Sequence, residues 1–263
     1  MSDTLNIKHK SLFSDILILI KYRLSFSVVL SSVASYLLAF DIFSAYTFIL
    51  LVIGGFLVVG SSNGFNQIIE RERDSLMSRT SNRPLPSGKM SIYQAIIICS
   101  ILAVIGLFML YTINFRTAFF GFVSMIIYLA VYTPLKPITP LSVFFGAIPG
   151  AIPFMLGWVA VTNKFSIETG ILFMIQFFWQ FPHFWSIGWV SHDDYKNAGF
   201  KMLPTGKRDN STAFQIVFYT IWMILVSTLP YFSFTGTFNI GLPSLVLILV
   251  AGKIGRASCR ERV

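Results

Sequence analysis

The stretch FILLVIGGFLVV (Phe48–Val59), followed shortly by NQIIERERD (Asn66–Asp74), decides the fold of this chain. The first stretch is a continuous apolar run, which is typical of a helix that lies in a lipid bilayer. The second stretch places acidic side chains just behind that run. On a helix, Asn66, Glu70 and Asp74 stand four residues apart and therefore share one face. The pattern predicts a membrane helix whose end presents a row of oxygen ligands.

These oxygen ligands are typical of a site for a hard metal ion. Mg²⁺ favours carboxylate and amide oxygens when a substrate phosphate completes its octahedral coordination. The residues that follow carry cations, namely Arg79, Arg83 and Lys89. An acidic cluster ringed by cations at a membrane surface indicates a metal–diphosphate site. The simpler alternative is a solvated charged loop at the end of a membrane helix.

The composition indicates a membrane protein. The chain has 263 residues, of which 55% are hydrophobic and only 12% charged, whereas soluble domains carry about 25% charged residues. A net charge of +9 would be compatible with nucleic-acid binding, but the basic residues cluster in loops between apolar runs. This is the positive-inside pattern of polytopic membrane proteins. We therefore expect membrane lipid, and no nucleic acid, around this chain.

Eight candidate spans can be drawn within a single transmembrane domain over residues 1–252, which predicts an all-α bundle of membrane helices. The eighth is too short for the ~20 residues that a span needs. The predicted spans are Leu19–Phe40, Ala45–Gly64, Ile92–Tyr111, Thr117–Tyr132, Leu141–Val161, Ile167–Val190, Thr212–Phe232 and Ile240–Gly252.

The last residues, KIGRASCRERV (Lys253–Val263), break the apolar pattern. They resemble the translation of a common sequencing-library adapter, so we expect them to be non-native and set them aside from the fold. We also expect the natural protein to continue beyond Gly252.

The loops alternate in charge. Lys and Arg are frequent before the first span and after the second and sixth spans, Lys136 lies after the fourth, and the intervening loops are short and poor in Lys and Arg. The positive-inside rule then places the N-terminus and both long acidic loops in the cytoplasm. We expect an integral membrane protein of a bacterial plasma (inner) membrane.

A second acidic loop reads SHDDYKNAGFKMLP (Ser191–Pro204). Asp193 and Asp194 are candidates to hold a second metal ion, and Lys196 or Lys201 to contact phosphate. Adjacent acidic residues are common in ordinary loops, so this signal depends on the loop facing the first cluster.

Other cations are candidates to bind diphosphate. Arg79 and Arg83 stand four residues apart and could grip phosphate oxygens with forked hydrogen bonds. Lys136, in a further loop on the same side, is another candidate phosphate ligand. Positive-inside topology alone is the alternative explanation for the two arginines.

The stretch WQFPHFW (Trp179–Trp185) lies inside the sixth predicted span. A histidine and a glutamine in a membrane helix are costly unless they face a cavity or a partner. Trp179, Gln180 and His183 would suit a large flat cofactor such as a porphyrin, contacted through its iron or a propionate. The alternative is a neutral His183 that hydrogen-bonds to a neighbouring helix.

These segments together resemble the haem O synthase (protohaem IX farnesyltransferase) family, within the superfamily of intramembrane prenyltransferases. The resemblance covers the chain from Tyr22 to about Pro230. Two departures are visible: Glu70 and Glu72 stand where the family usually has aspartates, and a ninth helix is expected in the family. The segments that carry the resemblance are Asn66–Asp74, Arg79–Leu85, Tyr132–Lys136, Gly157–Trp158, Trp179–Phe184 and Asp194–Pro204.

The resemblance implies a helical bundle around a central cavity. It also implies transfer of a farnesyl group from farnesyl diphosphate to a vinyl group of haem b, with addition of water, giving haem O and diphosphate. Haem-handling membrane enzymes are then expected partners. The implied roles are Mg²⁺ binding for Asn66, Glu70, Asp74, Asp193 and Asp194, diphosphate binding for Arg79, Arg83, Lys136 and Lys201, and haem binding for His183, Trp179 and Gln180.

Two alternatives stay open at this point. The chain could be a prenyltransferase that acts on a quinone precursor or another lipid acceptor, and an acceptor assay would decide. It could also be a transporter or a cofactor-binding membrane subunit. Metal-dependent release of diphosphate would separate an enzyme from these.

Overall fold

The computed structural model describes residues 12–231, and these residues form helices joined by turns, with no strand among them. The predicted all-α bundle is thus confirmed. The elements are α1 (Leu12–Leu19), α2 (Tyr22–Ala39), α3 (Ala45–Asp74), α4 (Ile92–Ile113), α5 (Phe115–Ile126), the π-helical η1 (Ile127–Tyr132), α6 (Thr133–Leu135), α7 (Ser142–Thr162), α8 (Ile167–Val190), α9 (His192–Asn197), α10 (Asn210–Thr228) and the short 3₁₀ turn η2 (Leu229–Tyr231).

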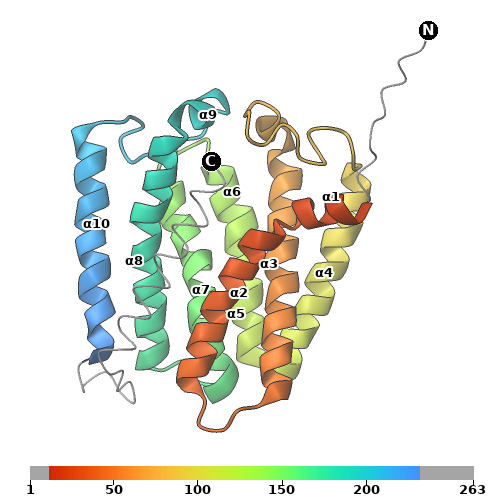
Figure 1. Ribbon diagram of the computed structural model, residues 1–263, viewed down its shortest axis with the longest axis vertical. Coiled ribbons are helices and arrows are strands. Elements are labelled where there is room, and N and C mark those ends of the chain that lie inside the picture. Colours follow the sequence, from red (N-terminus) through yellow and green to blue (C-terminus); the bar gives the residue numbers. More distant parts are fainter. Residues whose placement is uncertain (1–11, 232–263) are drawn as a thin grey trace.

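The long helices stand side by side, while α1 lies across one end of the bundle and α9 lies at the same end (Figure 1). Within residues 12–231, six helices are long and apolar enough to cross a membrane. They are α2, α3, α4, the continuous α5–η1–α6 segment, α7 and α10. The 24-residue α8 packs between α7 and α10. The predicted span Ile240–Gly252 and the tail Lys253–Val263 lie outside the described residues.

Three helices differ from the predicted spans at the charged end of the bundle. The first span begins at Tyr22, because Lys21 adopts a left-handed conformation (φ 47°, ψ 54°) that separates α1 from α2. The second span lies in α3, which continues through Asp74 as the shared helical face of Asn66, Glu70 and Asp74 predicted. The fourth continues through the π turn to Leu135. At 1.5 Å per residue, the 30 residues of α3 span about 45 Å, more than the ~30 Å apolar core of a bilayer.

Polar residues at the helix ends explain where several helices begin. Ser91 and Gln94 form a reciprocal capping box at the start of α4, which satisfies two backbone groups that the first turn leaves open. Asp209 accepts a hydrogen bond from the backbone N–H of Thr212 at 2.8 Å and starts α10 in the same way.

Helix α7 is the centre of the bundle. In its apolar window 78% of the residues are buried, against 17–33% in the other five candidate spans. Pro153 has no N–H, so the carbonyl of Pro149 lacks its usual helical donor. The hydroxyl of Ser124 on α5 donates to that carbonyl at 3.0 Å instead. At Gly157 a Cβ would overlap the backbone of Ser32 and Tyr36 on α2, so glycine permits the close approach of these helices.

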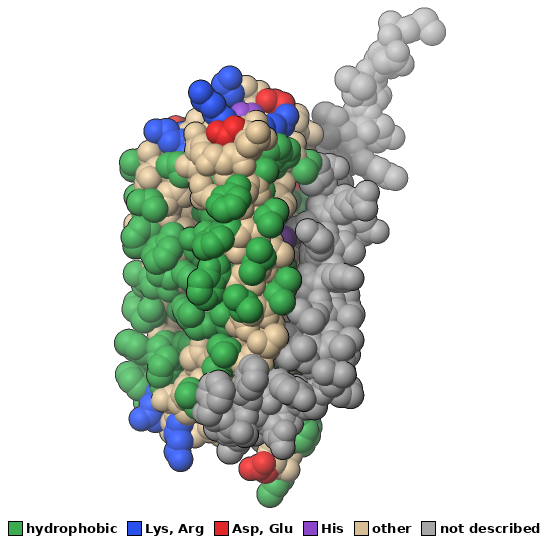
Figure 2. All heavy atoms as spheres, turned by 90° about the vertical axis from the view of Figure 1, so that its left-hand side faces the viewer, with side chains coloured by type: hydrophobic (Ala, Val, Ile, Leu, Met, Phe, Trp, Pro, Cys, Tyr) green, Lys and Arg blue, Asp and Glu red, His purple; other side chains and the backbone are tan. Residues whose placement is uncertain are grey.

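The flank of the molecule is apolar between two charged ends (Figure 2). Large apolar side chains on several helices, such as Ile53, Phe108 and Trp222, are exposed, as lipid-facing residues of a membrane bundle are. Both acidic loops and the N-terminal helix α1 lie at the same end of the bundle, as the loop charges predicted.

Candidate functional site

The last turns of α3 carry the three acidic and amide side chains that the sequence placed on one face. Asn66, Glu70 and Asp74 have relative exposures of only 1%, 6% and 1%. They are therefore buried groups inside the bundle, and the alternative of a solvated charged loop is wrong for them. Buried carboxylates need partners, because an unpaired charge away from water is costly.

Each of these side chains has a cationic partner from a different element. Lys21 Nζ donates to Asn66 Oδ1 at 3.1 Å. Lys136 Nζ lies 2.8 Å from Glu70 Oε1 and donates to Glu70 Oε2 at 3.1 Å. Arg83 Nη1 lies 2.7 Å from Asp74 Oδ2. Three cations thus meet two carboxylates, and the surplus positive charge suits the binding of an anion.

Lys21 was not among the predicted site residues, because the sequence indicated only a topology signal at this position. It reaches the site because the chain turns sharply between α1 and α2, in a conformation rare for residues other than glycine. Burial, together with the positive charges of Arg83 and Lys136, lowers the pKa of Lys21 to about 7. Its charge therefore responds to pH near neutrality. No local sequence signal marks such a turn.

The π-helical turn η1 sets the opposite wall of the site. Thr133, directly after it, accepts a hydrogen bond from Asn66 Nδ2 at 3.1 Å and donates to the carbonyl of Tyr128 at 2.8 Å. Lys136 Nζ lies 4.6 Å from the centre of the Tyr132 ring. Burial lowers the pKa of Lys136, but the nearby carboxylate of Glu70 outweighs burial, and the pKa is raised. Lys136 therefore stays protonated. The position of the π turn beside the cluster is consistent with the frequent occurrence of such turns at functional sites.

The second acidic loop contacts the first one at the rim of this cluster. Ser78 donates to Asp194 at 3.1 Å. Arg79 donates to the hydroxyl of Tyr195 at 3.2 Å and lies over its ring. The expectation that the two loops face each other is thus confirmed, although Arg79 and Asp194 lie at the outer edge of the buried cluster.

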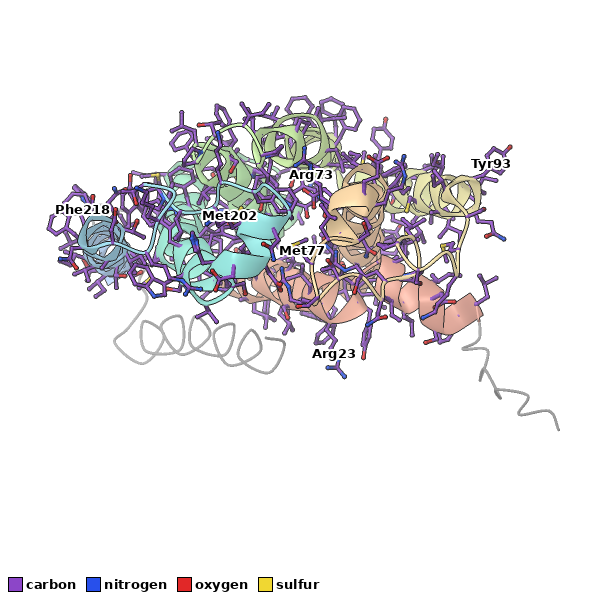
Figure 3. The ribbon with its side chains drawn as sticks, turned by 90° about the horizontal axis from the view of Figure 1, so that it is seen from above. Arg23, Arg73, Met77, Tyr93, Met202 and Phe218 are labelled. Carbon is purple, nitrogen blue, oxygen red and sulfur yellow. The ribbon has the colours of Figure 1, made fainter. Side chains whose placement is uncertain are left out.

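Arg73 and an apolar contact fasten the two loops together. Arg73 Nη1 donates to the carbonyl of Ala198 at 3.0 Å, and its guanidinium lies 5.7 Å from the Phe200 ring. Met77 and Met202 belong to one buried apolar cluster. Seen from above, these two methionines and Arg73 lie together between α3 and α9, whereas Arg23 points away from the bundle (Figure 3).

Two predicted ligands have side chains that contact groups outside the cluster. Asp193 is exposed and pairs with Arg208 at 3.4 Å. Lys201 Nζ donates to the carbonyl of Ile138 at 3.1 Å. Among residues 12–231 there is no group of three or more acidic, histidine or cysteine side chains arranged to hold a metal ion by themselves. The carboxylates of Glu70 and Asp74 are thus not a closed metal cage.

The porphyrin candidates divide between two sides of α8. Trp179 and His183 stack with ring centres 4.3 Å apart, and Phe184 continues from His183 toward Tyr132 through ring contacts of 5.7 Å and 6.3 Å. These rings form an aromatic path that leads to the charged cluster.

Gln180 has a different setting. It is buried, donates to the carbonyl of Ala147 at 3.2 Å and fills the space beside Gly150 on α7. The amide thus serves the packing of α8 on α7. Gln180 faces away from Trp179, because neighbouring positions on a helix point about 100° apart.

Comparison with known proteins gives one consistent family. Residues 28–260 match the model of the UbiA prenyltransferase family. The chain is 58% identical to protoheme IX farnesyltransferase from Christiangramia forsetii over 92% of this chain and 81% of that protein. It is 55% identical to protoheme IX farnesyltransferase from Flavobacterium psychrophilum over 92% of this chain and 82% of that protein.

The fold has solved counterparts. A UbiA homolog from Archaeoglobus fulgidus bound to DMAPP and Mg²⁺ superposes with a TM-score of 0.74 at 16% identity, covering 95% of this chain and 88% of that one. The same homolog bound to GPP and Mg²⁺ gives 0.73 at 16% identity, with the same coverage of both chains. At these identities the likeness concerns the fold alone.

Proposed function

This chain belongs to the UbiA prenyltransferase family, and we propose that it transfers the farnesyl group of farnesyl diphosphate to a vinyl group of haem b. Addition of water completes the product, haem O, and diphosphate is released. The names of relatives that are 55–58% identical support this reaction. The observation that carries the proposal is the buried cluster on α3, where Asn66, Glu70 and Asp74 meet three cations from separate elements.

The cations bind the diphosphate. Lys21, Arg83 and Lys136 converge on one side of α3, and their surplus positive charge is matched by the incoming anion. As the C–O bond of farnesyl diphosphate breaks, negative charge grows on the leaving group. Preplaced cations in a site shielded from water stabilise that charge, which is a large term in catalysis. Arg79, at the rim, contacts the outer phosphate oxygens.

The residues present fit a Mg²⁺ ion that binds together with the diphosphate. Glu70, Asp74 and Asp194 would supply carboxylate oxygens to this ion, and Asn66 an amide oxygen. Mg²⁺ is usually bound through one or two carboxylates plus substrate phosphates, so a closed protein cage is not required. When bound, the ion neutralises the phosphate oxygens and polarises the C–O bond.

The walls of the site protect the allylic cation. The buried ring of Tyr132 lies beside the cluster, and the π face of a tyrosine stabilises a cation. The vinyl group of haem b attacks this cation with its π electrons and forms the new C–C bond. One water then adds to the resulting cation and loses a proton, which completes the hydroxyethyl group.

The aromatic face of α8 receives the porphyrin. Trp179 and His183 form a stacked pair there, and Phe184 connects them to Tyr132. Haem seated on this face has its vinyl edge directed toward the charged cluster. Gln180, which hydrogen-bonds to α7, is not included in this contact. The basic loops around the cluster support a cytoplasmic orientation of the site in a bacterial plasma membrane.

The test is conversion of haem b by the full chain in membranes. We expect haem b and farnesyl diphosphate to give haem O and diphosphate in the presence of Mg²⁺, detected by product mass, and we expect EDTA to abolish the conversion. Prenylation of a quinone precursor with haem b left untouched would refute the haem acceptor. Absence of diphosphate release with any acceptor would refute the enzyme.

A further inference from the structure

A small cavity lies inside the bundle, in the half away from the charged cluster. Its volume is about 30 Å³. Five helices contribute to its wall. The residues that matter here are Val29 on α2, Gly55 and Val58 on α3, Leu110 on α4, Gly121 on α5 and Pro153 on α7.

The wall of the cavity offers no free hydroxyl donor to a ligand. Its two hydroxyl groups, on Ser32 and Ser124, both donate to carbonyls of α7. The distances are 2.7 Å to Pro153 and 3.0 Å to Pro149. These hydroxyls offer no donor to a ligand, so the occupant that fits is a hydrocarbon group.

The depth of the cavity can be measured along α3. The α3 residues that line it run from Val59 to Leu51, which precede Asn66 by 7 and 15 residues, so at 1.5 Å per residue the cavity lies about 10–22 Å along α3 from Asn66. An extended chain covers roughly 3.5 Å for every three bonds. On this scale, the ~12 main-chain bonds of a farnesyl group span about 14 Å, against about 9 Å for geranyl and about 19 Å for geranylgeranyl.

We propose that this cavity receives the branched end of the farnesyl chain, and that Gly55 and Val29 thereby favour a farnesyl chain over the shorter geranyl chain. The inference rests on the proposed function, because it takes the charged cluster as the diphosphate site. A water molecule needs about 10–15 Å³, so a cavity of about 30 Å³ holds two or three groups the size of a methyl. This suits the branched end of a prenyl chain and is far too small for a porphyrin.

Gly55 is the position that controls the room. A Cβ built on Gly55 meets only Val29 Cγ2, at 3.7 Å, which is ordinary van der Waals contact. A side chain here therefore enters the cavity without displacing the backbone. The adjacent Gly54 differs, because its Cβ would lie 3.0 Å from Met109 Cβ and 3.1 Å from the Gly106 carbonyl. Gly54 serves the packing of α3 on α4, whereas Gly55 leaves space for a ligand.

The experiment measures kcat/KM for geranyl, farnesyl and geranylgeranyl diphosphate with haem b, in the full chain and its variants. We expect Gly55→Val to lower the preference for farnesyl over geranyl diphosphate at least ~10-fold, the usual effect of one misfitting apolar group. We expect Val29→Ala, which enlarges the facing wall, to raise the use of geranylgeranyl diphosphate. Gly170→Val is the matched control, because Gly170 has no atom within 4 Å of its Cβ and lies outside the cavity.

Folding is followed in parallel by thermal melting in detergent. Folded Gly55→Val and Val29→Ala variants with wild-type preference ratios would overturn the proposal and leave a simple packing void. If the wild type does not prenylate haem b, the proposed acceptor fails separately. Competition of the three diphosphates for binding then still tests the cavity: unchanged competition ratios in Gly55→Val overturn it.

Discussion

Arg73 donates a hydrogen bond to the carbonyl of Ala198 at 3.0 Å, which joins the end of α3 to the loop after α9. The same guanidinium lies over the Phe200 ring, while Lys136 lies 5.6 Å from that ring. The Phe200 ring thus contacts two cations, Arg73 at the end of α3 and Lys136 after α6. This arrangement fixes how the loop with Asp194 sits above the carboxylates of α3.

We predict that Arg73→Gln weakens catalysis moderately. One hydrogen bond and an exposed cation–π contact are each worth about 1 kcal/mol or less, so kcat/KM for farnesyl diphosphate should fall roughly threefold to tenfold. Arg71→Gln is the control, because Arg71 pairs with Glu72 and donates to the Ile68 carbonyl, both on its own helix. Steady-state kinetics at several Mg²⁺ concentrations measure the effect. Equal losses in the two variants would contradict the proposed link between the loops.

We predict that Asp74→Asn abolishes most activity. The change keeps the size of the side chain but removes a carboxylate charge, and it leaves Arg83 without its ion-pair partner. Turnover should fall at least ~100-fold, as when a charge-stabilising group is lost. Activity per unit of membrane-inserted protein is the measurement. Glu72→Gln, at an exposed side chain on the same turn, should leave turnover within about twofold, since exposed ion pairs contribute little.

We predict that farnesyl diphosphate binds more weakly as the pH rises from 6 to 8. The pKa of Lys21 is about 7, so its charge is mostly present at pH 6 and mostly lost at pH 8 in the empty site. Diphosphate favours the charged form, so its KM should rise across this window. Lys21→Arg stays charged and should show a flatter profile. A wild-type profile that coincides with that of Lys21→Arg would exclude this role.

The stability of the empty protein should change in the opposite direction. The unfolded chain keeps an ordinary lysine pKa near 10.5, so above pH 7 it binds one more proton at Lys21 than the folded state. Stability then rises with pH between about 7 and 10 for this group. Thermal melting of wild type and Lys21→Met, compared over this range, isolates the contribution.

We predict that His183→Ala weakens haem binding while leaving farnesyl diphosphate binding intact. Loss of His183 removes the stacked partner of Trp179 from the proposed porphyrin face. The haem Kd, measured by absorbance titration, should rise at least tenfold. His192→Ala in α9 serves as the control histidine. Parallel losses of both ligands would indicate that His183 acts only in folding.

We predict that Gly157→Ala destabilises the bundle. The added methyl would overlap the backbone of α2 at Ser32 and Tyr36, and overpacking of this kind costs about 1–3 kcal/mol. The melting temperature in detergent should fall clearly. Gly170→Ala on α8, where a Cβ meets nothing within 4 Å, should not lower it. A Gly157→Ala melting temperature equal to that of the wild type would mean that the two helices separate easily.

Local patterns predicted much of this structure. The shared face of Asn66, Glu70 and Asp74 follows from helical periodicity, which needs only neighbouring residues. The apolar runs predicted the long helices because length and hydropathy decide whether a segment suits a membrane. The pairing of Arg83 with Asp74 was within reach for the same reason, since the two are joined by a short turn.

Features that depend on distant contacts were beyond the sequence pattern. Lys21 enters the site through a left-handed turn and a contact 45 positions along the chain. Asp193 and Asp194 are adjacent in sequence, yet one pairs with Arg208 and the other meets Ser78. Two identical residue types side by side give no sign of which one faces the site. Consecutive residues on a helix point in different directions, and only the fold decides which direction leads to the cluster. The same holds for Gln180 and His183.

The π turn at Ile127–Tyr132 sets the helical register of the residues that follow it. A π turn holds one residue more than the α-helical turn that it replaces, and Lys136 follows it after the three residues of α6. Deleting one residue here would convert the π turn to an α-helical turn and leave the residues downstream in place, with Lys136 still beside Glu70. Inserting a further residue would instead rotate the residues downstream by about 100° and carry Lys136 away from Glu70. Single-residue deletions within Ile127–Tyr132 should therefore be tolerated better than single-residue insertions, and the activities of matched deletion and insertion variants would show this difference.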